Sequence, residues 1–133
     1  MQKRFGVLII LLLTLPIVAF SNYVHWQGDY DKALYQAHQE HKALFVFLVK
    51  RETPLCREII KRVFMNQPYV DRINSEMVAV IVTYEGELSY PIELYYTTHF
   101  PTLFWVDSES ETFLSRPLYE RNISVDGLKN LLE

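Results

Sequence analysis

Three short apolar runs stand out in the pattern of hydrophobic and polar positions along the chain. Residues 43–49, 77–82 and 102–106 consist almost entirely of aliphatic and aromatic side chains. Runs of this length are too short for comfortable helices and are typical of strands that are buried on both faces of a sheet. The pattern therefore predicts three central strands.

Between and around these runs, apolar residues recur at helical spacing. The helical segments begin at residues that favour a helix start, such as Asp29, Thr53 followed by Pro54, and Ser124. The predicted helices cover, in chain order, residues 29–42, 53–66, a shorter turn after Pro68, 90–98 and 124–132.

Two further strands complete the predicted order. Residues 23–26 form a short first strand or an extended lead-in, and residues 107–110 form a turn from which residues 111–115 pair back as a fourth strand. The order β-α-β-α-β-α-β-β-α contains two strand–helix–strand crossovers. It predicts an α/β fold in which a central mixed β-sheet is covered by helices on both faces.

Residues 1–21 have the pattern of a secretory signal peptide. The pair Lys3-Arg4 precedes an apolar run over 6–20, and Ala19-Phe20-Ser21 offers a cleavage site. The run falls short of the roughly 20 residues of a spanning helix, although a retained N-terminal anchor stays open as the alternative. The sequence thus predicts export to the periplasm of one domain, residues 22–133, without a stable membrane span after cleavage.

The charge of the exported chain bears on its partners. Loss of Lys3 and Arg4 with the signal leaves eleven basic and sixteen acidic residues, a net charge of −5. Surfaces that bind nucleic acid are basic, so this balance argues against nucleic acid as a partner.

The chain holds one cysteine, Cys56, in the first turn of the predicted helix 53–66. A single cysteine cannot form an internal disulfide. It is therefore a buried thiol, a reactive thiol or half of an intermolecular bridge. In a parallel sheet, the loop and helix that follow a buried strand line the crevice where ligands bind. Cys56 is therefore a candidate site residue.

Several of these features together resemble a known family. They are Trp26, the helix that begins Asp31-Lys-Ala-Leu, the spacing from Cys56 to Val63-Phe64, and His99-Phe-Pro-Thr102 at the start of the third central strand. The chain resembles the thioredoxin-like superfamily over residues 24–132. More narrowly, it is similar to the exported group that includes the C-terminal domain of the disulfide reductant transporter DsbD.

The resemblance places Thr53-Pro54-Leu55-Cys56 at the Cys-x-x-Cys position of that family. Cys56 then corresponds to the second, resolving cysteine, and Thr53 replaces the nucleophilic one. Phe47 stands where the family often has a buried Asp, and Glu52 where it commonly has Trp. A threonine hydroxyl without an adjacent base does not attack a disulfide, so dithiol oxidoreductase turnover is not expected.

Three interpretations of Cys56 stay open. In the first, Thr53 caps the helix with Pro54 at the first helical position, and Cys56 is an inert buried thiol. In the second, Cys56 is a monothiol, activated by the helix N-terminus and by Arg51 or Arg57, that forms mixed disulfides with an exported protein partner or a small thiol. The third is a peroxidase, because peroxiredoxins carry Thr-x-x-Cys, but Val49 replaces the proline expected there.

A further hypothesis needs no thiol. By the resemblance, Phe100-Pro101 corresponds to the X-Pro pair whose peptide bond is cis in thioredoxin folds and whose first residue offers backbone groups to an extended peptide. Pro54, Leu55 and Tyr84 would join Phe100 in an apolar groove, which makes the protein a non-catalytic binding or accessory module.

The histidines are the remaining candidates. The resemblance brings His99 near Cys56, where it would form a thiolate–imidazolium pair, although an exposed loop histidine is the alternative. His38 and His41 share one helical face, but no third ligand is evident. The sequence predicts no metal site and no cofactor.

Overall fold

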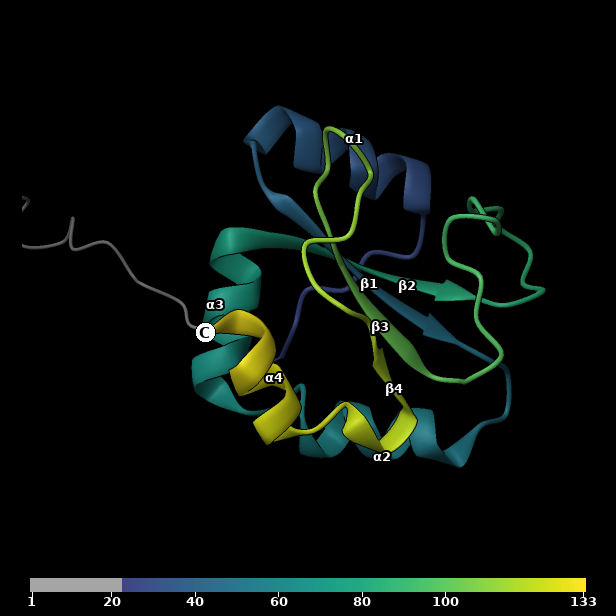
Figure 1. Ribbon diagram of the computed structural model, residues 1–133, viewed down its shortest axis with the longest axis vertical. Coiled ribbons are helices and arrows are strands. Elements are labelled where there is room, and N and C mark those ends of the chain that lie inside the picture. The colour runs from purple at the N-terminus through teal and green to yellow at the C-terminus, as the bar shows by residue number, and fades with distance from the viewer. Residues whose placement is uncertain (1–22) are drawn as a thin grey trace, which may run out of the picture.

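The computed structural model describes residues 23–133 as a central sheet with helices on both faces (Figure 1). The predicted signal peptide, residues 1–21, lies outside the described residues and stays a prediction. The elements are, in chain order, α1 (Tyr30–Glu40), β1 (Ala43–Val49), α2 (Pro54–Arg62), α3 (Gln67–Glu76), β2 (Met77–Thr83), β3 (Thr102–Val106), β4 (Leu118–Tyr119), the 3-10 helix η2 (Glu120–Asn122) and α4 (Val125–Leu132).

The sheet is mixed, with the strand order β2-β1-β3-β4. β1 runs parallel to β2 and antiparallel to β3, so Val46 lies between Val80 and Phe104 in the register. β4 adds a short antiparallel edge to β3. This arrangement confirms the predicted α/β fold, and the parallel β1–β2 pair is the expected result of a helical crossover.

Alternate residues of β1 enter two separate cores. Phe45 and Phe47 pack with apolar residues of α2, α3 and α4 on one face of the sheet. Leu44, Val46 and Leu48 pack with residues of α1 on the other face. Because successive side chains of a strand point to opposite faces, a strand that is buried on both reads as one continuous apolar run.

The predicted boundaries hold well in the first half of the domain. β1 covers the predicted residues, and β2 extends one residue beyond the prediction. The carboxylate of Asp29 accepts a hydrogen bond from the Lys32 amide at 3.2 Å and caps α1, which ends at His41 in a left-handed conformation. α2 ends at Arg62, earlier than predicted, and α3 is a full helix where a short turn was predicted.

The predicted helix over residues 90–98 is wrong. Only one turn forms, closed by hydrogen bonds from the amides of Leu94 and Tyr95 to the Pro91 carbonyl at 3.1 and 3.2 Å. Tyr90 and Tyr95 are both buried. Residues five apart lie about 140° from each other around a helix, so a helix could not bury both rings against one core.

The predicted fourth strand over residues 111–115 is also wrong. The chain after the turn makes one isolated bridge, between Phe113 and Val106, and the named strand β4 forms later, opposite Thr102 and Leu103. Pro117 has no amide hydrogen to donate, so continuous pairing from residue 111 to β4 is interrupted. Of the two alternatives predicted for residues 23–26, the strand does not form, and one isolated bridge follows them, between Gln27 and Val80.

Within residues 23–133, no helix has the length and apolar character needed to cross a bilayer.

Candidate functional site

The Thr53–Cys56 segment begins α2 directly after the turn that follows β1. Thr53 occupies the N-cap position with an extended backbone, and Pro54 follows it inside the first turn. The Cys56 amide donates to the Thr53 carbonyl at 3.1 Å. The capping hydrogen bond expected from the Thr53 side chain is not formed. The hydroxyl of Thr53 interacts with the thiol of Cys56 instead.

Cys56 is almost fully buried, with 6% of its surface exposed. Desolvation by burial is the largest influence on the thiol, and it raises the pKa of Cys56 above the ordinary value for cysteine. Hydrogen bonds from the Lys50 amide, the Thr53 hydroxyl and the Cys56 amide act in the opposite direction but are smaller. The thiol is therefore protonated at neutral pH, which is its unreactive form.

An open pocket of about 420 Å³ lies against the thiol. The residues lining it come from the end of β1, the turn, α2 and β2, and they are Val49, Lys50, Glu52, Thr53, Cys56, Arg57, Ile60 and Ile81. Arg57 thus lines the pocket, whereas Arg51 lines a different cavity near Gly86. Neither arginine contributes to the pKa shift of Cys56. The pocket gives a ligand access to the thiol without supplying charge that would ionise it.

Phe47, which the resemblance matches to a buried acid, is part of an aromatic cluster. The Phe47 ring is fully buried, with centroids 5.6 Å from Trp26 and 5.2 Å from Phe64. A carboxylate in this cluster would lose its hydration without gaining a partner. The packing around Phe47 therefore has no place for a carboxylate.

Phe100 and Tyr84 form an aromatic pair beside Pro101. Their ring centroids lie 5.1 Å apart, and the Lys50 ammonium lies 5.8 Å from the centroid of the Phe100 ring. The Phe100–Pro101 peptide bond is cis. The Pro101 carbonyl accepts from the Glu120 amide at 2.8 Å, but the main-chain N–H and C=O of Phe100 have no partner among residues 23–133. Phe100 thus offers an apolar ring and two free main-chain groups.

The structure brings only part of the predicted groove together. Phe100 and Tyr84 pack against the core on the α1 side of the sheet. Leu55 packs against the opposite core, where it lines a groove between α2 and the start of α4. Pro54 is exposed. The aromatic pair and Leu55 therefore face different surfaces.

The histidines are engaged elsewhere. His99 Nδ1 lies 2.8 Å from Glu120 Oε1, and the imidazole packs on the Tyr119 ring at 5.6 Å. His99 is not among the groups that shift the pKa of Cys56. His38 contacts the Ser108 carbonyl through Nε2. In the described part of the chain, no group of three or more His, Cys, Asp or Glu side chains could hold a metal ion.

A buried polar network was not predicted from the sequence. The Tyr30 hydroxyl donates to Glu111 Oε1 at 3.0 Å and accepts from the Tyr95 hydroxyl at 2.7 Å. The two tyrosines are almost fully buried, and burial raises the pKa of both, that of Tyr95 to about 12. Their separation in the sequence leaves no local signal that could have identified the network.

Comparisons with known proteins identify the fold. No protein-family model and no curated protein matches the sequence. Solved structures do match. A DsbH oxidoreductase is 18% identical with a TM-score of 0.66, covering 90% of this chain and 89% of its own. A candidate disulphide-isomerase from Bacteroides thetaiotaomicron is 24% identical with a TM-score of 0.69, covering 85% and 93%. A thioredoxin from Thermus thermophilus is 19% identical with a TM-score of 0.63, covering 83% and 85%.

At these identities the likeness establishes the fold alone. The chain has a thioredoxin-like α/β fold, as the resemblance predicted. What the neighbours do is not transferred with the fold, because function resides in the site and residues 23–133 hold a single cysteine, Cys56.

Proposed function

We propose that this protein is an exported, periplasmic member of the thioredoxin-like superfamily that has no dithiol turnover and binds an extended segment of a protein partner at Phe100. The periplasmic location is supported by the signal-like pattern of residues 1–21 and by the resemblance to the exported group. The observation that carries the binding function is the pair of free main-chain groups on Phe100, next to the Tyr84 ring.

The chemistry of Phe100 suits an extended peptide. A peptide that aligns with this residue gains main-chain hydrogen bonds to groups that have no partner within residues 23–133, and its side chains contact the Phe100 and Tyr84 rings. Each main-chain hydrogen bond contributes about 0.5–1.5 kcal/mol net, so the aromatic contacts supply much of the remaining affinity. No thiol is needed for this association.

The binding test uses an unfolded, carboxymethylated protein as the probe, because it has extended segments and no thiols. Phe100→Ala is expected to weaken binding by about tenfold, the loss typical of a removed aromatic anchor. Tyr35→Ala is the matched control, since Tyr35 is an exposed aromatic residue on α1. Equal affinity of Phe100→Ala and the wild type would contradict the proposal.

A parallel assay tests the absence of dithiol activity. Reduction of insulin disulfides by the purified protein should not exceed the rate of a free monothiol at the same concentration. Thr53 cannot form the mixed disulfide, and one sulfur cannot resolve it. Turnover comparable to that of a thioredoxin would refute this part of the proposal.

A second candidate function is favoured by the pocket at Cys56. The Lys50 amide, the Thr53 hydroxyl and the Cys56 amide each lower the pKa of the thiol, though less than burial raises it, and the pocket is open to solvent. As a monothiol, Cys56 would first lose its proton to solvent, and the thiolate would attack a disulfide of a small thiol or exported partner. One S–S bond forms as the other breaks, and the released half leaves as a thiolate that takes up a proton from solvent. Incubation with glutathione disulfide at pH 7 tests this. Rapid gain of one glutathionyl group by the folded protein favours the monothiol, and no gain until denaturation rules it out.

A further inference from the structure

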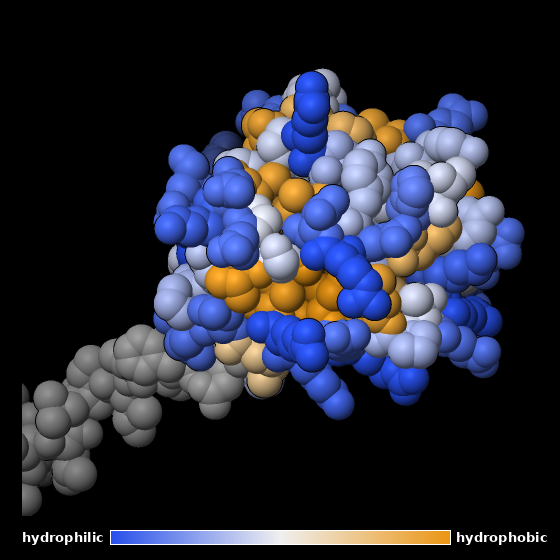
Figure 2. Space-filling view, turned by 60° about the horizontal axis from the view of Figure 1, so that its bottom comes forward, coloured by the Kyte–Doolittle hydropathy of each residue, from blue (hydrophilic) through white to orange (hydrophobic). Residues whose placement is uncertain are grey.

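An apolar groove runs between α2 and the start of α4, on the opposite side of the sheet from the aromatic pair. Its floor is formed by buried residues, chiefly Ile59, Val63 and Ile123, and its rim includes the more exposed Leu55 and Val125. Figure 2, which brings this side of the molecule forward, shows an apolar band bordered by hydrophilic residues. The groove has a volume of about 230 Å³, which limits it to a small number of apolar side chains.

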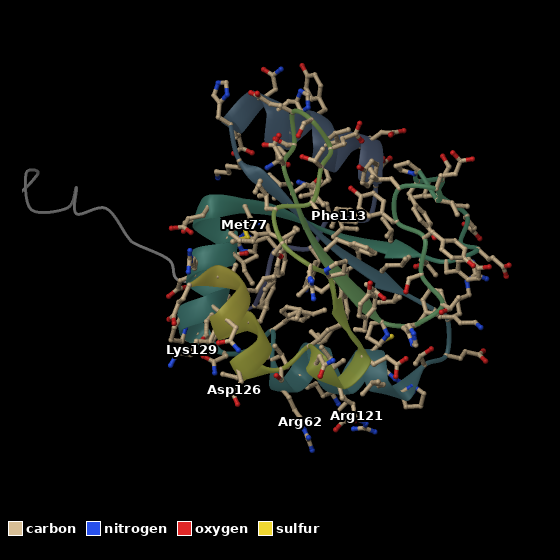
Figure 3. The ribbon with its side chains drawn as sticks, in the orientation of Figure 1. Arg62, Met77, Phe113, Arg121, Asp126 and Lys129 are labelled. Atoms are coloured by element: carbon tan, nitrogen blue, oxygen red, sulfur yellow. The ribbon has the colours of Figure 1, made fainter. Side chains whose placement is uncertain are left out.

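Two arginines and one glutamate, Glu58, line this groove, which leaves it a net charge of +1. Arg62 extends from α2 and Arg121 from η2, and both reach outward from the lower edge of the molecule in Figure 3. Arg62 pairs with Glu58 at 3.0 Å but stays largely exposed. Arg121 forms no ion pair within residues 23–133. Because Glu58 offsets Arg62, the positive charge of the rim rests chiefly on Arg121. An apolar floor beside this charge suits an acidic segment that carries exposed apolar side chains.

This chain itself carries such a segment. Residues 73–115 contain seven Asp and Glu residues and neither Lys nor Arg. Within them, the loop over 84–96 exposes three large apolar side chains, Leu88 at 58%, Ile92 at 51% and Tyr96 at 74%. The same loop carries Glu85, Glu87 and Glu93, none of which forms an ion pair within the described residues.

We propose that the acidic loop 84–96 of one copy docks in the α2–α4 groove of a second copy. The loop projects at the right of Figure 1, well away from α4 at the lower left, so the two surfaces cannot meet within one chain. Both requirements of the groove, apolar side chains and negative charge, are met by the loop. The occupant is therefore a copy of this chain.

The geometry of the contact has consequences for assembly. The loop and the groove are different surfaces, so each copy that offers its loop to one neighbour keeps its groove free for another. The association is therefore head-to-tail, and it produces a ring or an open series of oligomers. Because the groove is small and its charges are exposed, the association is weak and is screened by salt.

Sedimentation velocity of the processed, purified protein tests the proposal. The weight-average sedimentation coefficient should rise with protein concentration at an ionic strength of about 0.02 M, and this rise should be lost at about 0.5 M, where the Debye length is only a few ångströms. A protein that stays monomeric over the whole concentration range at low salt would overturn the proposal. A monomer is also the result expected if the groove binds an unrelated acidic protein.

Charge reversal makes the test specific. Arg62→Glu with Arg121→Glu should abolish the association, and so should Glu87→Lys with Glu93→Lys. An equimolar mixture of the two double variants should associate again, because each then offers a surface of opposite sign to the other. Lys32→Glu with Lys42→Glu, two cations outside the groove, is the matched control and should associate normally. No recovery in the mixture of the folded variants would overturn the proposal.

Discussion

The Thr53 hydroxyl interacts with the thiol of Cys56, three residues further along α2, and its oxygen accepts no hydrogen bond from an amide at the helix start. Where a dithiol protein holds two sulfurs, this protein holds a hydroxyl and a sulfur in contact. The hydroxyl stabilises the thiolate to some extent, but burial of Cys56 outweighs it.

We predict that Cys56 is alkylated slowly at neutral pH. Burial raises the pKa of Cys56, so the thiolate forms only at a pH above the value of about 8.5 typical of a free thiol. The same shift means that the thiol's contribution to stability is fully present below the unfolded pKa and is lost as pH rises through the folded pKa. The rate of iodoacetamide labelling of the folded protein, followed by mass spectrometry from pH 6 to pH 10, measures this directly. A labelling midpoint below about pH 7.5 would contradict it.

Thr53→Cys is predicted to restore a dithiol. The side chain at position 53 already contacts the Cys56 sulfur, so a second sulfur there lies within reach of a disulfide. The oxidised variant should lose two thiol equivalents per molecule and should gain insulin-reducing activity when it is reduced. Glu52→Cys is the control, because Glu52 has a left-handed backbone, with φ of 60°, one residue outside the helix cap. Failure of Thr53→Cys to form an internal disulfide would show that the side chains are not in contact.

The central strands could be predicted because their signal is local. A strand such as β1 that is buried on both faces needs an apolar residue at every position, and that pattern appears directly in the sequence. Residues 84–117 could not be predicted in the same way. Their course depends on tertiary contacts, such as the hydrogen bonds of Tyr30 to residues that are 65 and 81 positions away.

The candidate site likewise has a part that local sequence determines and a part that depends on tertiary contacts. The placement of Thr53 and Cys56 follows from a strand, a turn and a helix start, which are all local. The surface that Leu55 faces depends on the rotation of α2 over the sheet, which the spacing of apolar residues does not determine. The pairing of His99 with Glu120 depends on β3 and β4 lying side by side, and β4 was predicted in the wrong place.

Tyr30→Phe is predicted to destabilise the protein by about 1–3 kcal/mol, the cost of leaving a buried polar group without its partner. The variant removes the donor to Glu111 and the acceptor for Tyr95 while it keeps the aromatic ring. Urea denaturation at pH 7 measures the loss. Tyr96→Phe, an exposed neighbour of Tyr95, is the control and should change the free energy of unfolding by less than about 0.5 kcal/mol.

The same network predicts a loss of stability at alkaline pH. Burial raises the pKa of Tyr30 and Tyr95 in the folded state, so their contribution is fully present below the unfolded value of about 10 and is lost as pH rises toward the folded values. The free energy of unfolding of the wild type should therefore fall between about pH 10 and pH 12 more steeply than that of the double variant Tyr30→Phe/Tyr95→Phe. If the free energy of unfolding fell equally with pH in the two proteins, the hydroxyls would be solvated in the folded state.

Gly127→Ala is predicted to destabilise the domain, although the replacement of glycine by alanine in a helix ordinarily stabilises it by roughly 0.5–1 kcal/mol. A Cβ atom at Gly127 would lie 2.1 Å from the Asn122 carbonyl oxygen. Relief would require η2 to move away from α4, or would break the 3.0 Å hydrogen bond from the Gly127 amide to Ser124 Oγ. We expect a loss of about 1–3 kcal/mol, the usual cost of overpacking. Gly28→Ala is the control, because a Cβ there meets no atom within 4 Å. Thermal unfolding of both variants measures whether each substitution raises or lowers the stability. A Gly127→Ala variant as stable as the wild type would show that η2 and α4 can move apart without an energetic cost.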